Sequence, residues 1–408
     1  MKIIDLFAGA GGLSEGFRQE GYEIIAHVEM DKSACNTLKT REAFYYLKEN
    51  VLLDIYINYL LKKITRDELY ESIPQNILDR VIEAEISNKT IPKIFKQIDE
   101  LIEGDTVDLI IGGPPCQAYS TAGISRDPNR MKNDPRNYFY RYYVRFLRKY
   151  QPKMFVFENV RGILTAQEGK VFQNIKRNMR NAGYKVDYRI LNASEFGVSQ
   201  FRERVIIIGW KHDLPFKYPE FNLNIDAPTI QTLFDDLPKI KAGESVNGEK
   251  QYIKDPHEAI SDIRQKNWNI LTQHVARANN QNDLNIYRLV VEAWNNEGKV
   301  LKYNELPEDL KTHKNTDTFL DRYKNIKYER LSHTIVAHIS KDGHYYIHPD
   351  IEQNRSLTVR EAARIQSFPD DFYFEDSRTA AFKQIGNAVP PLMAKEIAKK
   401  LKSTEFLL

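Results

Sequence analysis

The residue whose placement points most directly to chemistry is Cys116. It follows a short apolar run at residues 107–111 and stands within residues 112–117, which read Gly-Gly-Pro-Pro-Cys-Gln. Open α/β sheets bind their ligands at the ends of strands, and two prolines hold a following thiol on a stiff path. This position predicts a nucleophilic thiol. The other cysteine, Cys35, lies in a helical pattern, and we expect it to be buried and inert.

A glycine-rich run forms a second candidate site. It follows the first apolar segment and spans residues 7–13, with glycines at 9, 11 and 12. Glycines between a strand and a helix let the backbone approach a cofactor closely. Glu29 ends the next apolar run, where a carboxylate can accept hydrogen bonds from ribose hydroxyls. The spacing lacks the full Gly-x-Gly-x-x-Gly fingerprint, so the pattern predicts an adenosine cofactor without saying which one.

The segments that carry these residues alternate between apolar runs and helical patterns. The runs cover residues 2–7, 22–28, 107–111, 154–157, 187–191 and 205–210. Strands without clean alternation, separated by helices, are typical of a parallel sheet covered on both faces. We therefore predict a doubly wound α/β domain over residues 1–210, with a mostly parallel sheet. Residues 56–97 are helical and charged, and we interpret them as an insertion.

A chain of 408 residues exceeds the usual size of one hydrophobic core, which predicts a second lobe. Residues 211–355 have an irregular pattern rich in prolines, asparagines and histidines, and we assign a smaller domain to them. Residues 356–408 are expected to complete the small lobe and return to the first domain. They begin with Thr358 and Glu361, which have the spacing of a capping box.

Six blocks of this sequence resemble the motifs of the DNA cytosine-5 methyltransferase family of the bacterial restriction-modification type, and they stand in the same order as in that family. They are residues 5–12, 114–117, 158–160, 200–204, 360–368 and 386–391. The resemblance covers nearly the whole chain outside the irregular lobe. It implies a class I methyltransferase fold with a target-recognition domain. It also implies methyl transfer from S-adenosylmethionine to carbon 5 of a flipped-out cytosine in a specific duplex DNA sequence.

The resemblance assigns four catalytic residues. Carbon 5 of cytosine is a poor nucleophile, so the ring must first become electron-rich by addition of a nucleophile at carbon 6, a role that falls to Cys116. Glu158 matches the carboxyl group that stabilises ring nitrogen 3 as a general acid. Arg202 and Arg204 resemble paired arginines that contact the cytosine carbonyl and the backbone near the thiol, and their alternation points both to one face. Ser199 departs from the family pattern, which commonly has a proline there.

The resemblance also implies a set of residues that bind S-adenosylmethionine. Phe7 is expected to pack on adenine, Glu29 to bind the ribose, and Asp54 to bond the adenine amino group. The helical insertion separates Asp54 unusually far from the cysteine motif. Asn387 and Val389 are expected near the methionine end. The other residues expected at the cofactor are Ala8, Gly9, Gly11, Gly12, Leu13, Met30, Ile55, Gly113 and Pro115.

A basic stretch with interleaved tyrosines follows Cys116. The resemblance suggests a loop that closes over double-stranded DNA, because an enzyme that acts on a stacked base must flip it out. The residues expected to touch DNA here are Gln117, Ser120, Arg126, Arg130, Lys132 and Arg136. In the second lobe, His274, Arg277 and Arg330 are candidates for contacts to the major groove. We expect no metal site, because no cysteine accompanies the histidines of this lobe.

Three alternative functions remain at this stage. A tRNA-directed relative of the same family is disfavoured by the large segment 211–354, and an inactive DNA-binding protein by the presence of every expected reactive residue. A nicotinamide-dependent dehydrogenase has no use for the cysteine motif. The first apolar run leaves no room for a signal peptide, and no apolar run approaches bilayer-spanning length. We therefore expect a cytoplasmic, nucleoid-associated monomer, with a restriction endonuclease as candidate functional partner.

Overall fold

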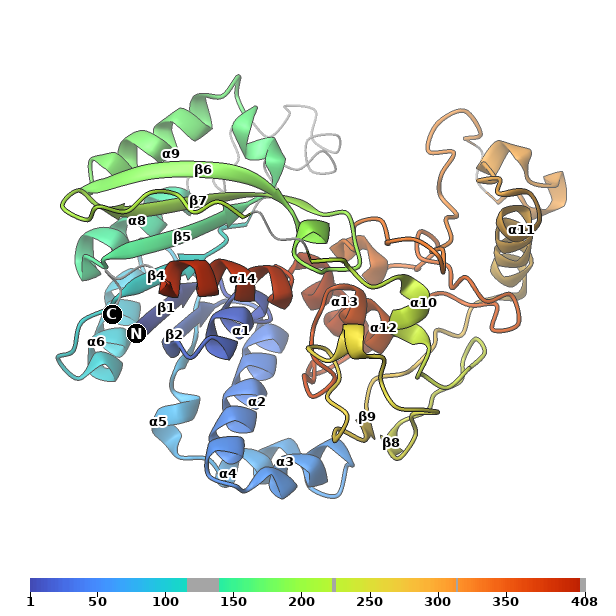
Figure 1. Cartoon of the computed structure of the whole chain (residues 1–408), viewed down its shortest axis with the longest axis horizontal. Coiled ribbons are helices and arrows are strands. Elements are labelled where there is room, and N and C mark those ends of the chain that lie inside the picture. Colours follow the sequence, from blue (N-terminus) through green and yellow to red (C-terminus); the bar gives the residue numbers. More distant parts are fainter. Residues whose placement is uncertain (116–138, 222–224, 313–314, 404–408) are drawn as a thin grey trace.

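A seven-stranded mixed sheet organises the first half of the chain (Figure 1). The computed structural model describes residues 1–115, 139–221, 225–312 and 315–403. The strand order is β3-β2-β1-β4-β5-β7-β6, in which β1 to β5 are parallel and β7 runs antiparallel to both of its neighbours. The strands are β1 (Lys2–Leu6), β2 (Glu23–Glu29), β3 (Val81–Glu83), β4 (Leu109–Gly112), β5 (Met154–Asn159), β6 (Tyr184–Asn192) and β7 (Glu203–Lys211).

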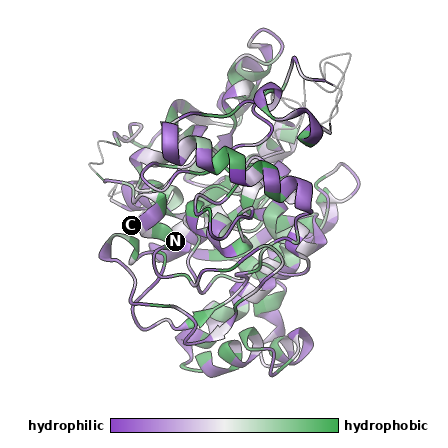
Figure 2. Ribbon diagram, turned by 90° about the vertical axis from the view of Figure 1, so that its right-hand side faces the viewer, coloured by the Kyte–Doolittle hydropathy of each residue, from purple (hydrophilic) through white to green (hydrophobic). Residues whose placement is uncertain are grey.

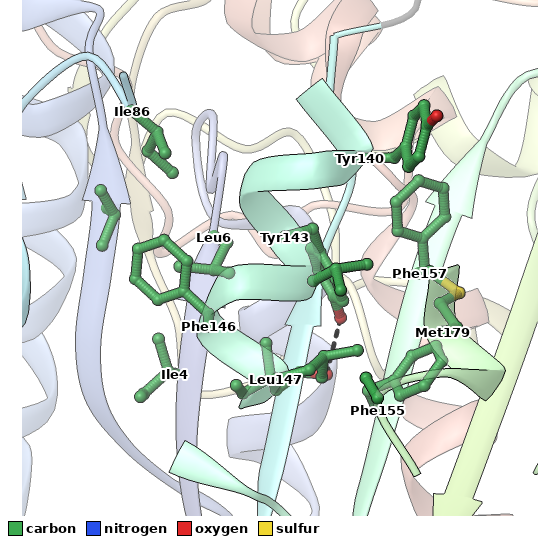
Figure 3. Close-up of a cluster of buried hydrophobic side chains, with 14 of the residues drawn as sticks. Ile4, Leu6, Ile86, Tyr140, Tyr143, Phe146, Leu147, Phe155, Phe157 and Met179 are labelled. Atoms are coloured by element: carbon green, nitrogen blue, oxygen red, sulfur yellow. Dashed lines mark hydrogen bonds between the residues drawn. The ribbon is translucent and has the colours of Figure 1, made fainter. Parts of the chain in front are cut away.

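Helices cover both faces of this sheet. One face carries α6 (Ile91–Ile102), α8 (Phe139–Tyr150) and α9 (Lys170–Arg180). In Figure 3, Tyr143 and Phe146 of α8 pack among side chains of β1 and β5, including Leu6 and Phe157. The Tyr143 hydroxyl lies 3.0 Å from the carbonyl oxygens of both Ile110 and Val156. Figure 2 shows hydrophobic and hydrophilic residues sharing individual helices, as amphipathic helices over a sheet require.

The other face is covered by α1 (Gly12–Gln19) and by the C-terminal helix α14 (Pro391–Lys402), drawn in red beside α1 in Figure 1. The two helices cross closely at Gly16, where an added Cβ would lie 2.3 Å from the backbone nitrogen of Lys395. The Tyr22 hydroxyl donates a 3.0 Å hydrogen bond to the carbonyl of Ala398. The last helix thus packs against the first.

The region between β2 and β4 differs from its expected form. It contains α2 (Lys32–Glu49), α3 (Leu53–Leu60), α4 (Arg66–Glu71) and α5 (Gln75–Leu78), but residues 81–83 form the edge strand β3, which pairs with β2. The interpretation of residues 56–97 as purely helical is therefore wrong. A strand of three residues is too short to show a period of two, so its pattern cannot be separated from that of the flanking helices.

Residues 225–358, which include most of the predicted smaller domain at 211–355 and are called the second lobe below, have little regular structure where they are described. The second lobe contains α10 (Ile230–Phe234), the short pair β8 (Gly248–Glu249) and β9 (Ile270–Leu271), and α11 (Gln281–Glu297), which projects at the far right of Figure 1. Two further helices follow the second lobe, α12 (Val359–Ile365) and α13 (Arg378–Asn387). Short 3-10 helices are η2 (Arg161–Leu164), η3 (Ala193–Glu195), η4 (Glu258–Ile260), η5 (Tyr303–Glu305), η6 (Glu308–Leu310) and η7 (Ala337–Ser340).

Helix α12 anchors the second lobe. The predicted capping box is confirmed, because the Thr358 side chain accepts from the Glu361 amide and Glu361 from the Thr358 amide. The helix also buries charge. Arg364 pairs with Asp236 of the lobe and, at 2.6 Å, with Asp370 beyond the helix. Within the described ranges, no helix combines the length and apolar character needed to cross a bilayer.

Candidate active site at the carboxyl ends of the strands

The carboxyl ends of β1, β4 and β5 meet at one edge of the sheet. Leu6 is paired with Gly112, and Gly112 with Phe157, so Phe7, Gly113 and Glu158 follow at neighbouring positions. An added Cβ on Gly113 would lie only 2.6 Å from Oε2 of Glu158. A side chain at position 113 would therefore displace the Glu158 carboxyl group from its present position. The backbone then continues through Pro114 and Pro115, the last described residues before Cys116.

Asn159 fixes the path of the backbone toward Cys116. It is buried at the end of β5, and its Nδ2 donates a 3.1 Å hydrogen bond to the carbonyl of Pro114. Its Oδ1 accepts from the amide of Val160. Asn159 was not among the site residues predicted from the sequence. Its position could have suggested a role, because an amide side chain directly after Glu158 is suited to holding a neighbouring loop.

Glu158 and Arg204 form a largely buried ion pair. Arg204 Nε donates to Glu158 Oε1 at 2.8 Å, and the two side chains are 12% and 13% exposed. Burial raises the pKa of Glu158, while the charges of Arg204 and Arg202 and the hydrogen bond from Arg204 oppose that rise. The net shift is upward. A carboxyl group whose pKa is raised keeps its proton at a higher pH than an exposed glutamate, which suits a general acid.

Arg202 does not lie where the sequence placed it. Its side chain is buried, and its guanidinium donates to the carbonyls of Ile335 at 2.7 Å, Gly386 at 3.2 Å and Ala388 at 2.8 Å. The expectation that Arg202 contacts the substrate is corrected. Carbonyls at the C-terminal end of α13 lack helical partners, and the guanidinium supplies the donors they need. Arg202 is a positioning residue that joins β7 to segments more than 100 residues away.

The chain before Arg202 is held by hydrogen bonds rather than by the proline that the family commonly has. Ser199 Oγ donates 2.6 Å to the carbonyl of Pro228, and the Ser332 amide donates 2.8 Å to the carbonyl of Ser199. The Gln200 side chain bonds the Ile335 amide and the Ile365 carbonyl. Local rigidity is therefore present at Ser199.

Glu29 gathers backbone amides from two turns. Its Oε2 accepts from the Gly9 amide, and its Oε1 accepts from the amides of Met30 and Asp31, each at 2.8 Å. Burial raises the pKa of Glu29, and the three amides oppose that rise. The carboxylate thereby fixes the loop after β1 against the turn after β2. Phe7 begins this loop with a left-handed φ of 56°, a costly conformation that is found often at functional sites.

The glycine loop meets the C-terminal part of the chain at Gly12. An added Cβ there would lie 2.2 Å from the carbonyl oxygen of Val389. The sequence-predicted cofactor residues fall into three groups by burial. Met30 and Asn387 are exposed, Phe7, Ala8, Gly9, Glu29, Gly113 and Pro115 are half-buried, and Gly11, Gly12, Leu13 and Val389 are buried. The structure therefore brings together residues from β1, β2, β4 and the end of α13.

Replacing Gly12 by Ala is expected to lower the stability of the fold by about 1–3 kcal/mol, because the methyl group would overpack the contact with Val389. Thermal unfolding with and without S-adenosylhomocysteine measures the effect. Glu49→Ala is the control, since Glu49 is exposed at the C-terminal end of α2 and its replacement adds no atom to a packed contact. Equal melting temperatures for Gly12→Ala and the wild type would show that this contact is not tight.

The family model for C-5 cytosine-specific DNA methylases matches residues 1–74 and 68–403. The type II methyltransferase M.Bpa9945I of Bacillus paralicheniformis is 42% identical, and the match covers 98% of each chain. The type II methyltransferase M1.HphI of Haemophilus parahaemolyticus is 31% identical over 98% of this chain and 86% of that protein. This chain belongs to the C-5 cytosine-specific DNA methylase family.

Solved structures support the class I methyltransferase fold of this methylase. A prophage-encoded protein of Escherichia coli matches with a TM-score of 0.65 at 23% identity, covering 98% of both chains. A mutant of DNMT2 from Spodoptera frugiperda matches with a TM-score of 0.53 at 17% identity, covering 98% of this chain and 99% of that one. At these identities the likeness shows the fold alone.

Asp54 and Ile55 do not lie at the sheet edge where β1, β2 and β4 end. Asp54 is exposed on α3, and Ile55 packs in the hydrophobic cluster between α2 and α3. The strand that reaches the edge is β3, where Glu83 pairs with Glu29 and the Ala84 amide donates 2.8 Å to the Glu29 carbonyl. The assignment of Asp54 and Ile55 is corrected, because they belong to a helix that packs away from the sheet.

The chain that leaves β3 at this edge carries Glu85 and Ile86. Ala84 separates them from the end of the strand. Glu85 is exposed, and Ile86 is buried in the core cluster against which Phe7 packs. The signal that could have found them is the apolar pair Val81 and Ile82 followed by acidic residues. A pattern of two apolar residues was too short to stand out within a helical region.

Two of the three DNA contacts expected in the second lobe are corrected. His274 is fully buried, with its ring nitrogens 3.2 Å from Thr358 Oγ1 and 2.9 Å from the carbonyl of Pro238, and burial lowers its pKa to about 4. Arg277 is buried too, where it donates to the carbonyls of Ile339 and Lys341. Neither side chain can reach DNA, because both satisfy polar groups inside the lobe.

Arg330 stays a candidate for a DNA contact. It is exposed, and its guanidinium lies 5.0 Å from the centroid of the Trp294 ring, over which Lys327 also lies at 4.0 Å. The other expected contacts, Gln117, Ser120, Arg126, Arg130, Lys132 and Arg136, lie outside the described residues, as does Cys116. In the part of the chain that is described, no three His, Cys, Asp or Glu side chains are grouped as a metal ion would require.

Proposed function

We propose that this methylase transfers a methyl group from S-adenosylmethionine to carbon 5 of a flipped-out cytosine in a specific duplex DNA sequence. The reaction proceeds through a covalent bond between Cys116 Sγ and carbon 6. The observation that carries the proposal is the buried Glu158–Arg204 pair, which lies against Gly113 at the sheet edge from which the chain leads to Cys116. A carboxyl group with a raised pKa beside a nucleophile is the pair that this reaction needs.

The cofactor residues of this chain fit an adenosine group. Glu29 presents a carboxylate held in place by three amides, beside the left-handed backbone of Phe7, Gly9 and Gly11. Phe7 and Ile86 would contact the adenine, Glu29 the ribose, and Asn387 with the backbone of Val389 the methionine end. Gly12 and Leu13 would contribute backbone only, because they are buried. When bound, S-adenosylmethionine supplies an electrophilic methyl group.

The chemical steps follow from the protein groups. The Cys116 thiolate forms a bond to carbon 6, and the carboxyl group of Glu158 gives its proton to ring nitrogen 3, so that the ring gains electron density at carbon 5. Carbon 5 would then take the methyl group, whose bond to the sulfonium sulfur breaks and leaves S-adenosylhomocysteine. A base removes the carbon 5 proton, the Cys116–carbon 6 bond breaks, the thiolate leaves, and nitrogen 3 returns its proton to Glu158. Arg204 holds the carboxyl group toward the ring.

Binding of DNA is proposed to involve the basic residues after Cys116 together with Arg330. Positively charged side chains neutralise phosphates, and this makes the affinity for DNA depend on the salt concentration. The named relatives are type II methyltransferases, and we propose that this chain likewise acts in a restriction-modification system with a cognate endonuclease. We propose that it works as a monomer in the cytoplasm, associated with the nucleoid.

The experiment that tests the function has two arms. Bisulfite sequencing of DNA from cells that express the chain is expected to show methylated cytosine at one short recurring sequence. A duplex with 5-fluorocytosine at that site, incubated with the protein and S-adenosylmethionine, is expected to become trapped on a peptide that contains Cys116. Absence of the adduct would overturn the covalent mechanism. Methylation of tRNA without methylation of duplex DNA would support the tRNA-directed alternative.

A further inference from the structure

The segment between α12 and α13 connects three parts of the molecule. We call residues 370–376 the acidic strap. It holds four carboxylates, Asp370, Asp371, Glu375 and Asp376. The first of them pairs at 2.6 Å with Arg364 of α12. The other three pair with arginines of the first domain and its insertion. A chain segment of seven residues therefore carries charge contacts in several directions.

On one side, the acidic strap contacts α2 of the first domain. Arg41 pairs with Asp371 at 2.9 Å. The Glu375 amide donates 2.9 Å to Thr37 Oγ1, and Thr40 Oγ1 donates to the Glu375 carboxylate. These side chains project from one helix, whose N-terminal cap Asp31 lies two residues after Glu29. The strap is thus fixed to the helix that leaves the cofactor edge.

On the other side, the acidic strap contacts the second lobe. The Phe374 amide donates 3.0 Å to Gln273 Oε1, and Gln273 Nε2 returns a 2.8 Å bond to the Phe374 carbonyl. The Asp370 amide donates 2.7 Å to the carbonyl of Ile263. All three bonds involve backbone atoms of the strap, so the strap is held in register with the lobe.

The helical insertion, α3 and α4, closes over the acidic strap. The Tyr56 hydroxyl donates 2.8 Å to the Asp371 carbonyl, and the Tyr59 hydroxyl donates 2.7 Å to the Glu375 carboxylate. Arg66 of α4 lies 3.4 Å from Glu375 and 2.9 Å from Asp376. Both tyrosine side chains are buried. These groups would be costly to bury unless the strap satisfied them.

The insertion also contacts the second lobe directly. Trp268 and Ile270 of the lobe belong to the same hydrophobic cluster as Tyr56 and Tyr59 of α3. In contrast, the two residues of α3 expected at the cofactor lie away from that edge, with Asp54 exposed and Ile55 packed in this hydrophobic cluster. The described contacts of the insertion therefore serve the junction between the two units and not the reacting groups.

We propose that the insertion is an interdomain brace that holds the second lobe in a fixed orientation to the sheet through the acidic strap. Tyr59 and Arg66 are then positioning residues for DNA methylation. This inference rests on the proposed function, in which the duplex lies against both units. Interfaces between domains of one chain commonly permit relative motion, and buried directional hydrogen bonds restrict that motion. Loss of the brace would lower the affinity for DNA and the preference for the cognate site, but it would leave the affinity for the cofactor unchanged.

The test compares Arg66→Gln and Tyr59→Phe with the wild type. We expect the KM for cognate DNA to rise, and the preference for the cognate site over single-mismatch duplexes to fall, by roughly threefold to thirtyfold, the range typical of coupling through a packed network. The dissociation constant of S-adenosylhomocysteine, measured by calorimetry, should stay within about twofold. Arg66→Lys should restore part of the site preference, because it keeps a cation near Asp376.

The matched control is Arg189→Gln, which removes a 2.9 Å ion pair with Asp187 on β6, away from the strap and the lobe. Unchanged DNA parameters in both brace variants, or parallel loss of cofactor and DNA binding, would overturn the brace. If Arg66→Gln does not fold, the test rests on Tyr59→Phe, which removes only the hydroxyl that bonds Glu375 and keeps the ring in place. An inactive wild type on duplex DNA would instead reject the proposed function, and an active wild type with unaffected variants would reject the brace alone.

Discussion

Replacing Glu158 by Gln is expected to lower kcat for cytosine methylation by about 10²- to 10⁴-fold, the usual contribution of a general acid. Glutamine keeps the size of the side chain but cannot give a proton to ring nitrogen 3. Its amide can still contact Arg204, so the fold should persist. Single-turnover transfer of a labelled methyl group, with the enzyme in excess over DNA, measures the step without product release.

Glu203→Gln is the matched control for that experiment. Glu203 precedes Arg204 on the same strand, but its carboxylate is exposed and pairs with Arg161 at 2.9 Å. Its loss should leave the rate within about twofold, since exposed ion pairs contribute little. Equal rates for Glu158→Gln and Glu203→Gln would remove Glu158 from the chemistry.

The raised pKa of Glu158 predicts the direction of a pH effect. The group must be protonated to act as an acid, so kcat should fall as the pH rises through its pKa. Because burial raises the pKa and Arg204 opposes this, Arg204→Met should raise the pKa further and move the alkaline limb of the profile to higher pH. A limb that moves to lower pH in this variant would contradict the assignment.

Replacing Cys116 by Ser is expected to reduce methylation by at least about 10³-fold, as removal of a catalytic nucleophile commonly does. A serine hydroxyl is far less ionised and less nucleophilic than a thiol, so it cannot add to carbon 6 at a useful rate. The adduct with 5-fluorocytosine DNA should disappear from denaturing gels. Binding of S-adenosylhomocysteine should persist, because the thiol does not hold the cofactor.

Cys35 offers the internal control. It is fully buried in the cluster with Leu38 and Val81, and burial raises the pKa of its thiol to about 12. Such a thiol is scarcely ionised near neutral pH, so Cys35→Ala should keep both the methylation and the trapped adduct. An adduct that survives Cys116→Ser but is lost in Cys35→Ala would reverse the assignment of the two cysteines.

The sequence was informative wherever chemistry depends on local backbone features. A short apolar strand that ends in glycines locates the loop of Phe7, and another that ends in Gly112 and Gly113 leads to Cys116. Because strand ends gather at one edge of a parallel sheet, their proximity to Glu158 followed from the order of elements. The alternation of Arg202 and Arg204 was also visible, but it does not say which side chain will be buried.

Tertiary structure decided the questions that depend on distant partners. Arg202 and Arg204 differ because the carbonyls of Ile335 and Ala388 surround one and Glu158 meets the other. His274 lies in the core because Pro238 and Thr358 supply its hydrogen bonds.

Spacing records which residue types stand near one another along the chain, and it therefore predicted the reactive groups and identified the family. Burial and hydrogen-bond partners come from segments far apart in sequence. Only the packed chain therefore decides whether a charged side chain faces a substrate or satisfies a buried carbonyl.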